Sequence, residues 1–210
     1  MENNNLVTIG GEIASGFNYS HEVFGEKFYL FDLKVARISE AFDIIPVMIS
    51  ERLVDVEKDM RGTYLKIKGQ YRSHNKRDGE KAHLMLSVFA KEVEIKEEII
   101  DILDACNENM VTLDGYICKP TIYRKTPLGR EIADVLLAVN RPYGKTDYIP
   151  MIMWGRNARY VSELPVGTRL NVFGRLQSRT YMKQISETES ESRTAYEVSV
   201  TRFLVVKEDN

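Results

Sequence analysis

The 210-residue sequence contains little cysteine and little histidine. Its two cysteines, Cys106 and Cys118, belong to no Cys-x-x-Cys pair and lie in no histidine-rich stretch. This excludes a disulfide framework and a zinc ribbon, and both cysteines are interpreted as small buried or half-buried residues. The three histidines, His21, His74 and His83, are scattered, and none has a Ser, Cys or acidic partner at a spacing suited to catalysis. The sequence therefore favours a binding protein over an enzyme, with no metal and no cofactor.

A long hydrophobic run is also absent. No apolar stretch approaches the roughly 20 residues that cross a bilayer, and residues 1–5 lack a basic region followed by an apolar one. Hydrophobic residues make up 43% of the chain and charged residues 29%, which is enough apolar material for a buried core. We therefore expect a soluble, cytoplasmic protein of one or two domains.

The formal net charge is only −2, which by itself argues against a nucleic-acid-binding protein. The charge is unevenly distributed, however. Residues 1–104 carry 14 Lys and Arg against 19 Asp and Glu, whereas residues 109–183 carry 12 against 5. Positive charge is thus concentrated in one stretch, which favours a polyanionic partner for the C-terminal half.

An internal repeat with an offset of 104 residues organises the chain. Small, polar and apolar framework positions recur in the same order in both halves, and after a one-residue insertion the order continues. The matched pairs are Asn5 with Asn109, Val7 with Val111, Gly11 with Gly115, Arg37 with Arg141, Pro46 with Pro150, Gly69 with Gly174 and Ser73 with Ser178. Because chance does not preserve such an order, the chain holds two copies of one domain.

Each copy is predicted to form five short strands and one helix. In the second copy the strands are expected at 111–117, 132–140, 148–154, 169–175 and 196–205, with a helix at 157–164 between the third and fourth strands. The corresponding strands of the first copy are 6–13, 28–37, 44–49, 64–71 and 83–95, with a helix near 51–59. This order of elements is that of an OB-fold, a small Greek-key barrel.

The predicted fold is therefore all-β with short helices, arranged as two tandem OB-folds, each a five-stranded Greek-key barrel. The N-terminal OB-fold spans 1–95, a helical connector spans 96–108, and the C-terminal OB-fold spans 109–206. The polar residues 186–193 are expected to form an exposed, mobile hairpin loop between the last two strands.

Three segments of the second copy resemble the bacterial single-stranded DNA-binding protein (SSB) family. The first is a Thr-Pro-x-Gly turn in residues 124–129 (RKTPLG), followed at a fixed distance by residues 137–141 (LAVNR). The second is residues 147–150 (DYIP) running into 154–156 (WGR), and the third is residues 174–181 (GRLQSRTY). Three such segments in order, at barrel spacing, identify the second copy as a member of this family, and the first copy joins it through the repeat.

The resemblance implies that the chain binds single-stranded DNA without reading its sequence. Such binding needs flat aromatic faces on which bases stack and cations that follow the phosphates. The family's stacking positions correspond here to Tyr143, Tyr148, Trp154 and Tyr181, and nearby or aligned basic positions are Arg141, Arg156, Arg175 and Arg179.

A purely structural interpretation of these side chains stays open from the sequence. Trp154 closes an otherwise apolar run and would also serve to seal the barrel, and Tyr148 is open to either role. Tyr143 and Tyr181 lie in polar, turn-like surroundings, which favour a surface position. Any single arginine could be an ordinary solvated charge.

The first copy lacks the stacking residues. Ser39, Ile44, Ser50 and Lys76 occupy the four positions, although Arg37 and Arg52 keep two basic ones. Its own aromatics, among them Phe24, Phe28, Tyr29 and Phe31, are interpreted mainly as core, although the adjacent Phe28 and Tyr29 must face opposite sides of a strand. We therefore expect the first copy to act mainly in structure or assembly.

By resemblance, two chains would form a homodimer that presents four OB-folds, although a two-barrel monomer stays open. Family members typically continue into a long Gly-, Gln- or Pro-rich tail with an acidic tip, whereas this sequence ends five residues after Val205. We therefore expect no tail-mediated recruitment of proteins. The alternative function is that of an OB-fold accessory protein of the primosome type, which acts through protein–protein contacts.

Overall fold

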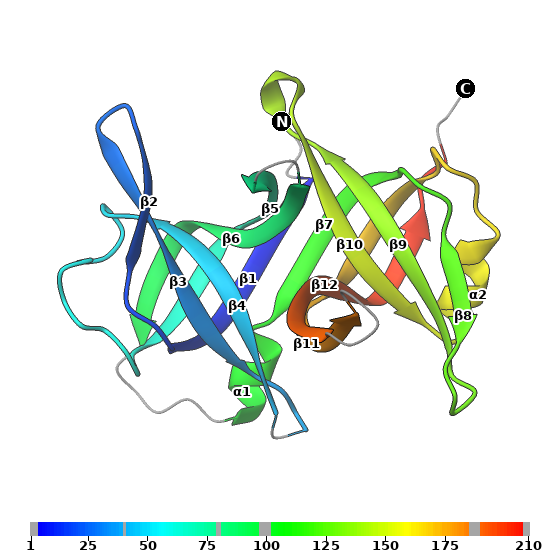
Figure 1. The fold of residues 1–210 in the computed structure, drawn as a ribbon, viewed down its shortest axis with the longest axis horizontal. Helices are drawn as coiled ribbons and strands as arrows, with labels where there is room; N and C mark the ends of the chain where they lie inside the picture. Colours follow the sequence, from blue (N-terminus) through cyan, green and yellow to red (C-terminus); the bar gives the residue numbers. More distant parts are fainter. Residues whose placement is uncertain (1–3, 40, 79–80, 97–101, 185–189, 208–210) are drawn as a thin grey trace.

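The computed structural model describes residues 4–39, 41–78, 81–96, 102–184 and 190–207. Two β-barrels lie side by side in this structure and share one continuous twelve-stranded sheet (Figure 1). The predicted fold, two tandem OB-folds, is confirmed. Each barrel encloses a core of alternating apolar side chains, with Leu33 and Ile67 at the centre of one and Leu137 and Leu170 at the centre of the other.

The N-terminal barrel closes through five strands. β1 (Asn5–Ile13) pairs with both β3 (Glu26–Ala36) and β5 (Tyr64–Asp78), β3 pairs with β4 (Phe42–Ser50), and β5 pairs with β6 (Lys81–Lys96). A parallel contact between β4 and β6 completes the barrel. A further strand that the sequence did not indicate, β2 (Asn18–Val23), extends β3 as an exposed hairpin.

The C-terminal barrel repeats this topology. β7 (Met110–Ile117) pairs with β9 (Glu131–Asn140) and β11 (Arg169–Gln184), β9 pairs with β10 (Thr146–Trp154), and β11 pairs with β12 (Ser190–Val205). β10 and β12 close the barrel in parallel. β8 (Ile122–Lys125) extends β9, and the 3-10 turn η1 (Pro142–Gly144) connects β9 to β10.

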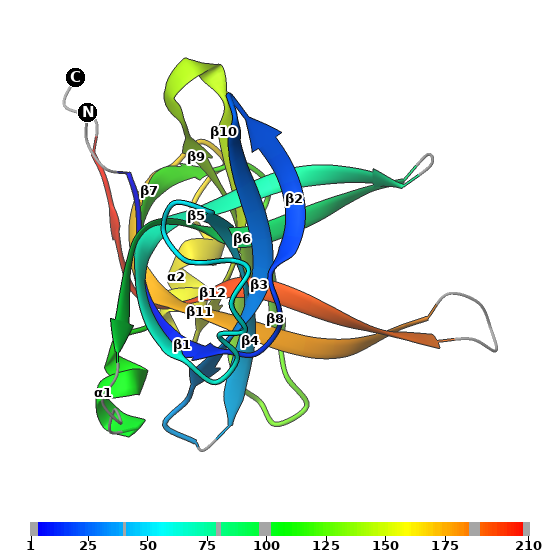
Figure 2. The same ribbon diagram turned by 90° about the vertical axis from the view of Figure 1, so that its left-hand side faces the viewer.

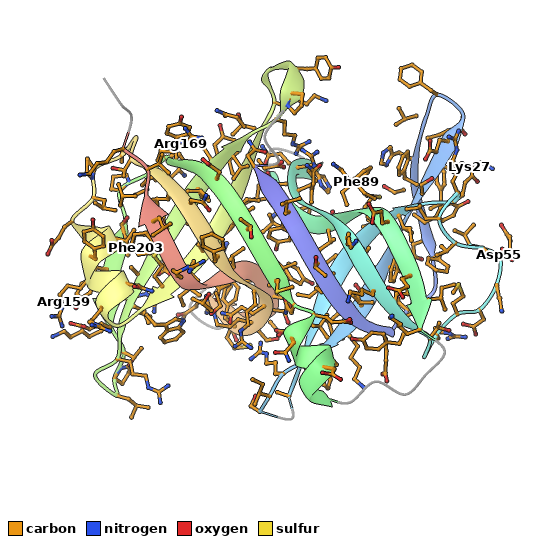
Figure 3. All side chains as sticks on the ribbon, turned by 180° about the vertical axis from the view of Figure 1, so that it is seen from behind. Lys27, Asp55, Phe89, Arg159, Arg169 and Phe203 are labelled. Atoms are coloured by element: carbon orange, nitrogen blue, oxygen red, sulfur yellow. The ribbon has the colours of Figure 1, made fainter. Side chains whose placement is uncertain are left out.

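β1 and β7 join the two barrels as an antiparallel pair, with Val7 opposite Val111. The strands β6, β5, β1, β7, β11 and β12 therefore form one six-stranded surface, seen from behind in Figure 3. The long hairpins β5–β6 and β11–β12 both project toward the opposite side (Figure 2). The two barrels are thus arranged like a pair of subunits fused into one chain.

The prediction of a helix near 51–59 in the N-terminal barrel is wrong. This segment forms a series of turns, in which the carboxylates of Asp55 and Asp59 accept hydrogen bonds from the backbone N–H groups two residues further on, at 3.2 and 3.1 Å. Such local bonds compete with the helical pattern. Val54 and Met60 are nevertheless buried, so the turns still cover the end of the barrel. The C-terminal barrel has the expected helix, α2 (Arg156–Ser162).

Of the helical connector expected at 96–108, residues 102–107 form α1 (Ile102–Asn107), Lys96 ends β6, Glu108 lies in a turn, and residues 97–101 lie outside the described part. Glu108 at its end fixes it to the N-terminal barrel, because its carboxylate accepts a hydrogen bond from the Tyr64 hydroxyl at 2.9 Å and pairs with Lys66 at 2.7 Å. Of the hairpin loop expected at 186–193, residues 185–189 lie outside the described part. Residues 190–193 are not loop but the start of β12.

The remaining expectations concern the cysteines, membrane-spanning helices and the aromatic residues of the N-terminal barrel. Cys118 is half-buried as predicted, whereas the Cys106 side chain lies outside the described part. The described residues include no helix long and apolar enough to cross a membrane. The core interpretation is confirmed for Phe31 but wrong for Phe24, which is fully exposed at the tip of the β2–β3 hairpin.

Candidate functional site

Two of the predicted stacking residues lie on the outer face of β10. Side chains along β10 alternate, so that Ile149, Met151 and Met153 enter the core while Tyr148 and Trp154 point outward. Tyr148 is 43% exposed and Trp154 41%. Trp154 therefore does not seal the barrel, and both rings offer a face to solvent.

Tyr143 occupies the turn at one end of this strand. Its side chain is completely exposed and its backbone is left-handed, with φ of 64° next to Gly144 at 68°. A bulky residue rarely adopts this conformation, and residues that do are concentrated at functional sites. The turn thus holds an aromatic ring in solvent at a cost in backbone strain.

The fourth ring lies on the β11–β12 hairpin. Arg175, Arg179 and Tyr181 share the outer face of β11, because they are separated by even numbers of residues. The Arg179 guanidinium lies 5.7 Å from the centre of the Tyr181 ring and 3.7 Å from the carboxylate of Glu197. The hairpin therefore presents an aromatic ring with a cation beside it.

Arg156 begins α2, two residues after Trp154, and is exposed. Gly155 makes this sharp corner with φ of 57°, a value that glycine adopts without steric cost. The helix itself is held to the barrel by the buried Ala158 and Val161. The corner therefore places an exposed cation two residues along the chain from Trp154.

Arg141 occupies a different position from the other predicted contacts. Its Nε donates to Asp147 Oδ2 at 2.6 Å, and its Nη2 donates to the Ser73 carbonyl of the N-terminal barrel at 2.8 Å. Asp147 is fully buried and also accepts a hydrogen bond from the Ser73 N–H at 2.6 Å. The donors of Arg141 thus hold the two barrels together, and its role as a DNA contact stays a prediction.

The same contact recurs between the equivalent residues of the other copy. Arg37 Nε donates to Asp43 at 2.7 Å and Arg37 Nη2 to the Ser178 carbonyl at 2.9 Å, and the Ser178 N–H donates to Asp43 at 2.6 Å. The hydrogen bond with Asp43 raises the pKa of Arg37 above its ordinary value. The barrel–barrel contact therefore explains why these arginines and serines recur in both copies. The repeat offset of 104 residues also matches Asp43 with Asp147, the two carboxylates of this contact.

Arg72 breaks this symmetry. It occupies the position of Gln177 in the other copy, and its Nη1 lies 3.2 Å from Asp147 Oδ2. Burial and the nearby Arg141 lower the pKa of Arg72, but an arginine keeps its proton in proteins. Within the described residues, two guanidinium groups thus face one carboxylate at this contact, whereas Asp43 faces only Arg37.

The outer surface of the C-terminal barrel therefore carries four exposed rings, with Arg179 beside Tyr181. Among the described residues there is no cluster of three or more His, Cys, Asp or Glu side chains suited to a metal ion. Residues 108–206 match the family model described as the single-strand binding protein family. The C-terminal barrel belongs to this family.

Individual relatives agree with the match. The chain is similar to single-stranded DNA-binding protein 1 of Staphylococcus aureus (strain COL), with 39% identity over 83 residues, which is 36% of this chain and 50% of the relative. It is also similar to single-stranded DNA-binding protein A of Bacillus subtilis (strain 168), with 35% identity over 97 residues, 40% of this chain and 56% of the relative. The chain thus spans about half the length of the curated relatives it matches.

The complete two-barrel fold has its own counterpart. The crystal structure of the wild-type single-stranded DNA binding protein from Thermus aquaticus superimposes with a TM-score of 0.67 and 21% sequence identity, covering 98% of this chain and 94% of that one. A deletion mutant of that protein gives 0.69. At this identity the likeness shows a shared fold: the tandem arrangement, and not only the C-terminal barrel, has a known precedent.

Proposed function

We propose that this protein binds single-stranded DNA without sequence specificity, mainly through the outer surface of its C-terminal barrel. Bases would stack on Tyr143, Tyr148, Trp154 and Tyr181, and Arg156, Arg175 and Arg179 would contact phosphates. The observation that carries the proposal is that all four predicted stacking positions have exposed rings, from 37% for Tyr181 to 100% for Tyr143. A base contributes roughly 1–3 kcal/mol when it stacks on an aromatic ring, whatever its identity.

The charge distribution supports the same ligand. The stretch 109–183 carries a large excess of Lys and Arg, and phosphate contacts of this kind supply affinity independent of sequence. The relatives in Staphylococcus aureus and Bacillus subtilis are named for single-stranded DNA binding. Roles in replication, repair or recombination, and a location in the cytoplasm, belong to the same proposal, as does the absence of enzymatic activity.

Trp154 supplies the test, because it is the only tryptophan of the chain. Titration with oligo-dT should quench its fluorescence, whereas duplex DNA should leave it nearly unchanged. The affinity should fall as salt is raised, because phosphate contacts release counterions. An unchanged signal, together with no binding of a labelled strand at low salt, would reject the proposal.

The assembly is proposed to be a homodimer with four OB-folds. The six-stranded surface carries exposed apolar side chains, Leu6 on β1, Met110 on β7 and Leu204 on β12, next to the half-buried Phe173. Leu6 and Phe173 both pair with Thr112, which places them on one face. A continuous sheet face of this composition is suited to an identical face of a second chain.

The alternative is a protein-binding accessory factor of the primosome type. The observation that favours it is the acidic N-terminal half, in which the four stacking positions carry no aromatic residue. On this alternative, Trp154 fluorescence would not respond to oligo-dT. The same titration therefore separates the two functions.

A further inference from the structure

The N-terminal barrel has an aromatic ring on the same rung of the sheet where the C-terminal barrel has Trp154. In the C-terminal barrel Trp154 on β10 lies opposite Ile132 on β9. At the repeated rung of the N-terminal barrel Ser50 on β4 lies opposite Phe28 on β3. The aromatic residue of this rung lies on β10 in the C-terminal barrel and on β3 in the N-terminal barrel. A comparison of aligned positions alone therefore shows only that Ser50 replaces the aromatic residue Trp154.

Phe28 points to the outer face of its barrel. Core side chains of β3 are Phe31, Leu33 and Val35, and strand alternation sends Phe28 to the opposite side. Ser50, its neighbour across the rung, donates a hydrogen bond to Glu26, and Arg52 pairs with that carboxylate at 3.4 Å. The small, tethered Ser50 leaves the outer face of this rung to the ring of Phe28.

Phe28 is the middle member of a row of three rings. His21 on β2 stacks on it with ring centres 5.1 Å apart and planes at 12°, and Phe89 on β6 lies 5.7 Å away at 30°. His21 belongs to a hairpin strand that is exposed along its whole length. Phe28 and Phe89 are half-buried, and the exposed His21 ends the row with a flat ring on which an unpaired base can stack.

A cleft leads from these rings toward the C-terminal barrel. Its volume is about 460 Å³, and Ser20, His21, Met48, Phe89, Arg72 and Arg141 contribute to its walls. A second hollow of about 310 Å³ adjoins it and reaches Lys145 and Tyr148 of the C-terminal barrel. Ser73, His74 and Arg141 line both, so the two hollows are direct neighbours.

The cleft has an excess of positive charge. Arg72 and Arg141 are each 23% exposed in their side chains, while the one carboxylate between them, Asp147, is fully buried. The Asp147 carboxylate is closed to a ligand, whereas both arginine side chains line the cleft. Rings at one end, arginines in the middle and Tyr148 at the other end make a path suited to a single strand of nucleic acid.

We propose that the row His21–Phe28–Phe89 is a second base-stacking site, and that the cleft past Arg72 and Arg141 carries one continuous DNA strand from it to Tyr148. The inference rests on the proposed function of the C-terminal barrel and extends it. The N-terminal barrel then binds DNA with rings of its own, while the C-terminal barrel keeps the larger share of the contacts.

Two single-tryptophan proteins test this site. Both carry Trp154→Phe, which removes the natural fluorophore and keeps a flat ring. One adds His21→Trp in the proposed row, and its matched control adds Phe42→Trp at the far end of β4, where Phe42 is 55% exposed. Each is titrated with oligo-dT of about 30 nucleotides, longer than the 4–16 that one OB-fold covers. Anisotropy of a labelled strand measures binding in parallel.

In the His21→Trp protein we expect fluorescence to fall to a plateau as oligo-dT is added, with the same midpoint as the anisotropy curve. In the Phe42→Trp protein we expect no loss of fluorescence. Binding by anisotropy without loss of fluorescence in the His21→Trp protein, or with equal loss in both proteins, overturns the second site and leaves the proposed function intact. Failure of the unmodified protein to bind the strand overturns the proposed function itself.

A second measurement uses affinity. The double variant Phe28→Leu with Phe89→Leu keeps apolar volume but removes both flat faces. It should bind the 30-nucleotide strand about tenfold more weakly, the loss of one stacked base, and bind a strand of about 8 nucleotides unchanged at the C-terminal barrel. Equal affinity for the long strand in the variant and the unmodified protein contradicts the second site.

Discussion

Single side chains of this protein divide into those that face a ligand and those that hold the barrels together, and their residue types do not separate the two groups. Arg156 and Arg141 are both arginines near exposed aromatics, yet Arg156 is exposed while Arg141 binds the buried Asp147. The partner of each guanidinium, rather than its charge, decides its role. Predictions for substitutions therefore follow from partners and exposure.

Replacing both rings of β10, with Trp154→Ala and Tyr148→Ala, should weaken binding of oligo-dT about 30-fold or more, because two stacking contacts are lost. Arg52→Ala in the N-terminal barrel is the comparison, since Arg52 is 70% exposed and pairs with Glu26. It should change the affinity by less than about threefold. Anisotropy of a labelled strand measures both. Equal losses would contradict the dominant role of the C-terminal barrel.

Asp147→Asn should destabilise the protein by about 3 kcal/mol, since it leaves two arginines facing a neutral amide at a buried contact. Asp59→Asn is the matched control. Asp59 also pairs with an arginine, Arg61, but the two side chains are 61% and 64% exposed, and exposed pairs contribute little. Urea unfolding monitored by circular dichroism gives the free energies, and similar values for the two variants would be inconsistent with this role of Asp147.

At the scale of elements, the repeat preserves the irregularities of the strands. The pairing of β5 with β6 shifts register between Lys68 and Gly69, and that of β11 with β12 shifts between Phe173 and Gly174. Such bulges bend a strand around a small barrel. Just beyond them, Asn5 and Asn109 each bond to the backbone of the bent strand, with Asn5 contacting Tyr71 and Asn109 contacting Leu176. The repeated Gly and Asn positions are thus required by strand geometry.

Gly174→Ala should lower the free energy of unfolding by about 2 kcal/mol, because a Cβ at this bulge would collide with the carbonyl oxygen of Ser199 on the neighbouring strand. The backbone on both sides is paired and cannot move away cheaply. Gly16→Ala is the control, since a Cβ there meets no atom within 4 Å, and it should stay within about 0.5 kcal/mol. Thermal or urea unfolding measures the stability of both variants. Equal losses of stability in the two would contradict this prediction for Gly174.

At the scale of the whole molecule, one chain has two distinct broad faces. The free ends of the hairpins β5–β6 and β11–β12 project from one side, and the six-stranded surface lies on the other (Figures 2 and 3). On the proposals made above, one face would bind DNA while the other would bind a second chain. Assembly and DNA binding are then separable by mutation.

Light scattering at micromolar concentration should give twice the chain mass of 24.2 kDa. Leu6→Glu with Met110→Glu should reduce it to the mass of one chain, because charge on the six-stranded surface opposes burial. Leu128→Glu, at a residue 85% exposed elsewhere, is the control and should leave the dimer intact. A mass of one chain for the unmodified protein would refute the homodimer.

The five strands that close each barrel, and their order, follow from the amino-acid sequence alone, whereas β2 and β8 were not predicted. Alternation of apolar and polar residues and the offset of 104 predicted two barrels, and local motifs identified the family of the second one. The sequence was misleading at residues 51–59, where Asp55 and Asp59 bond locally and replace the expected helix by turns. It also could not separate core from surface among Phe28, Tyr29 and Phe31 beyond their alternation.

Contacts across strands and across barrels depend instead on the assembled fold. Alternation tells on which face Phe28 lies, but the register of β3 against β4 is needed to place it opposite Ser50. Likewise, Asp147 lies 74 residues from Ser73 along the chain, and their contact depends on how β5 packs on β10. These pairings are set by the closure of each barrel and by the β1–β7 junction, which are properties of the complete sheet rather than of any local segment.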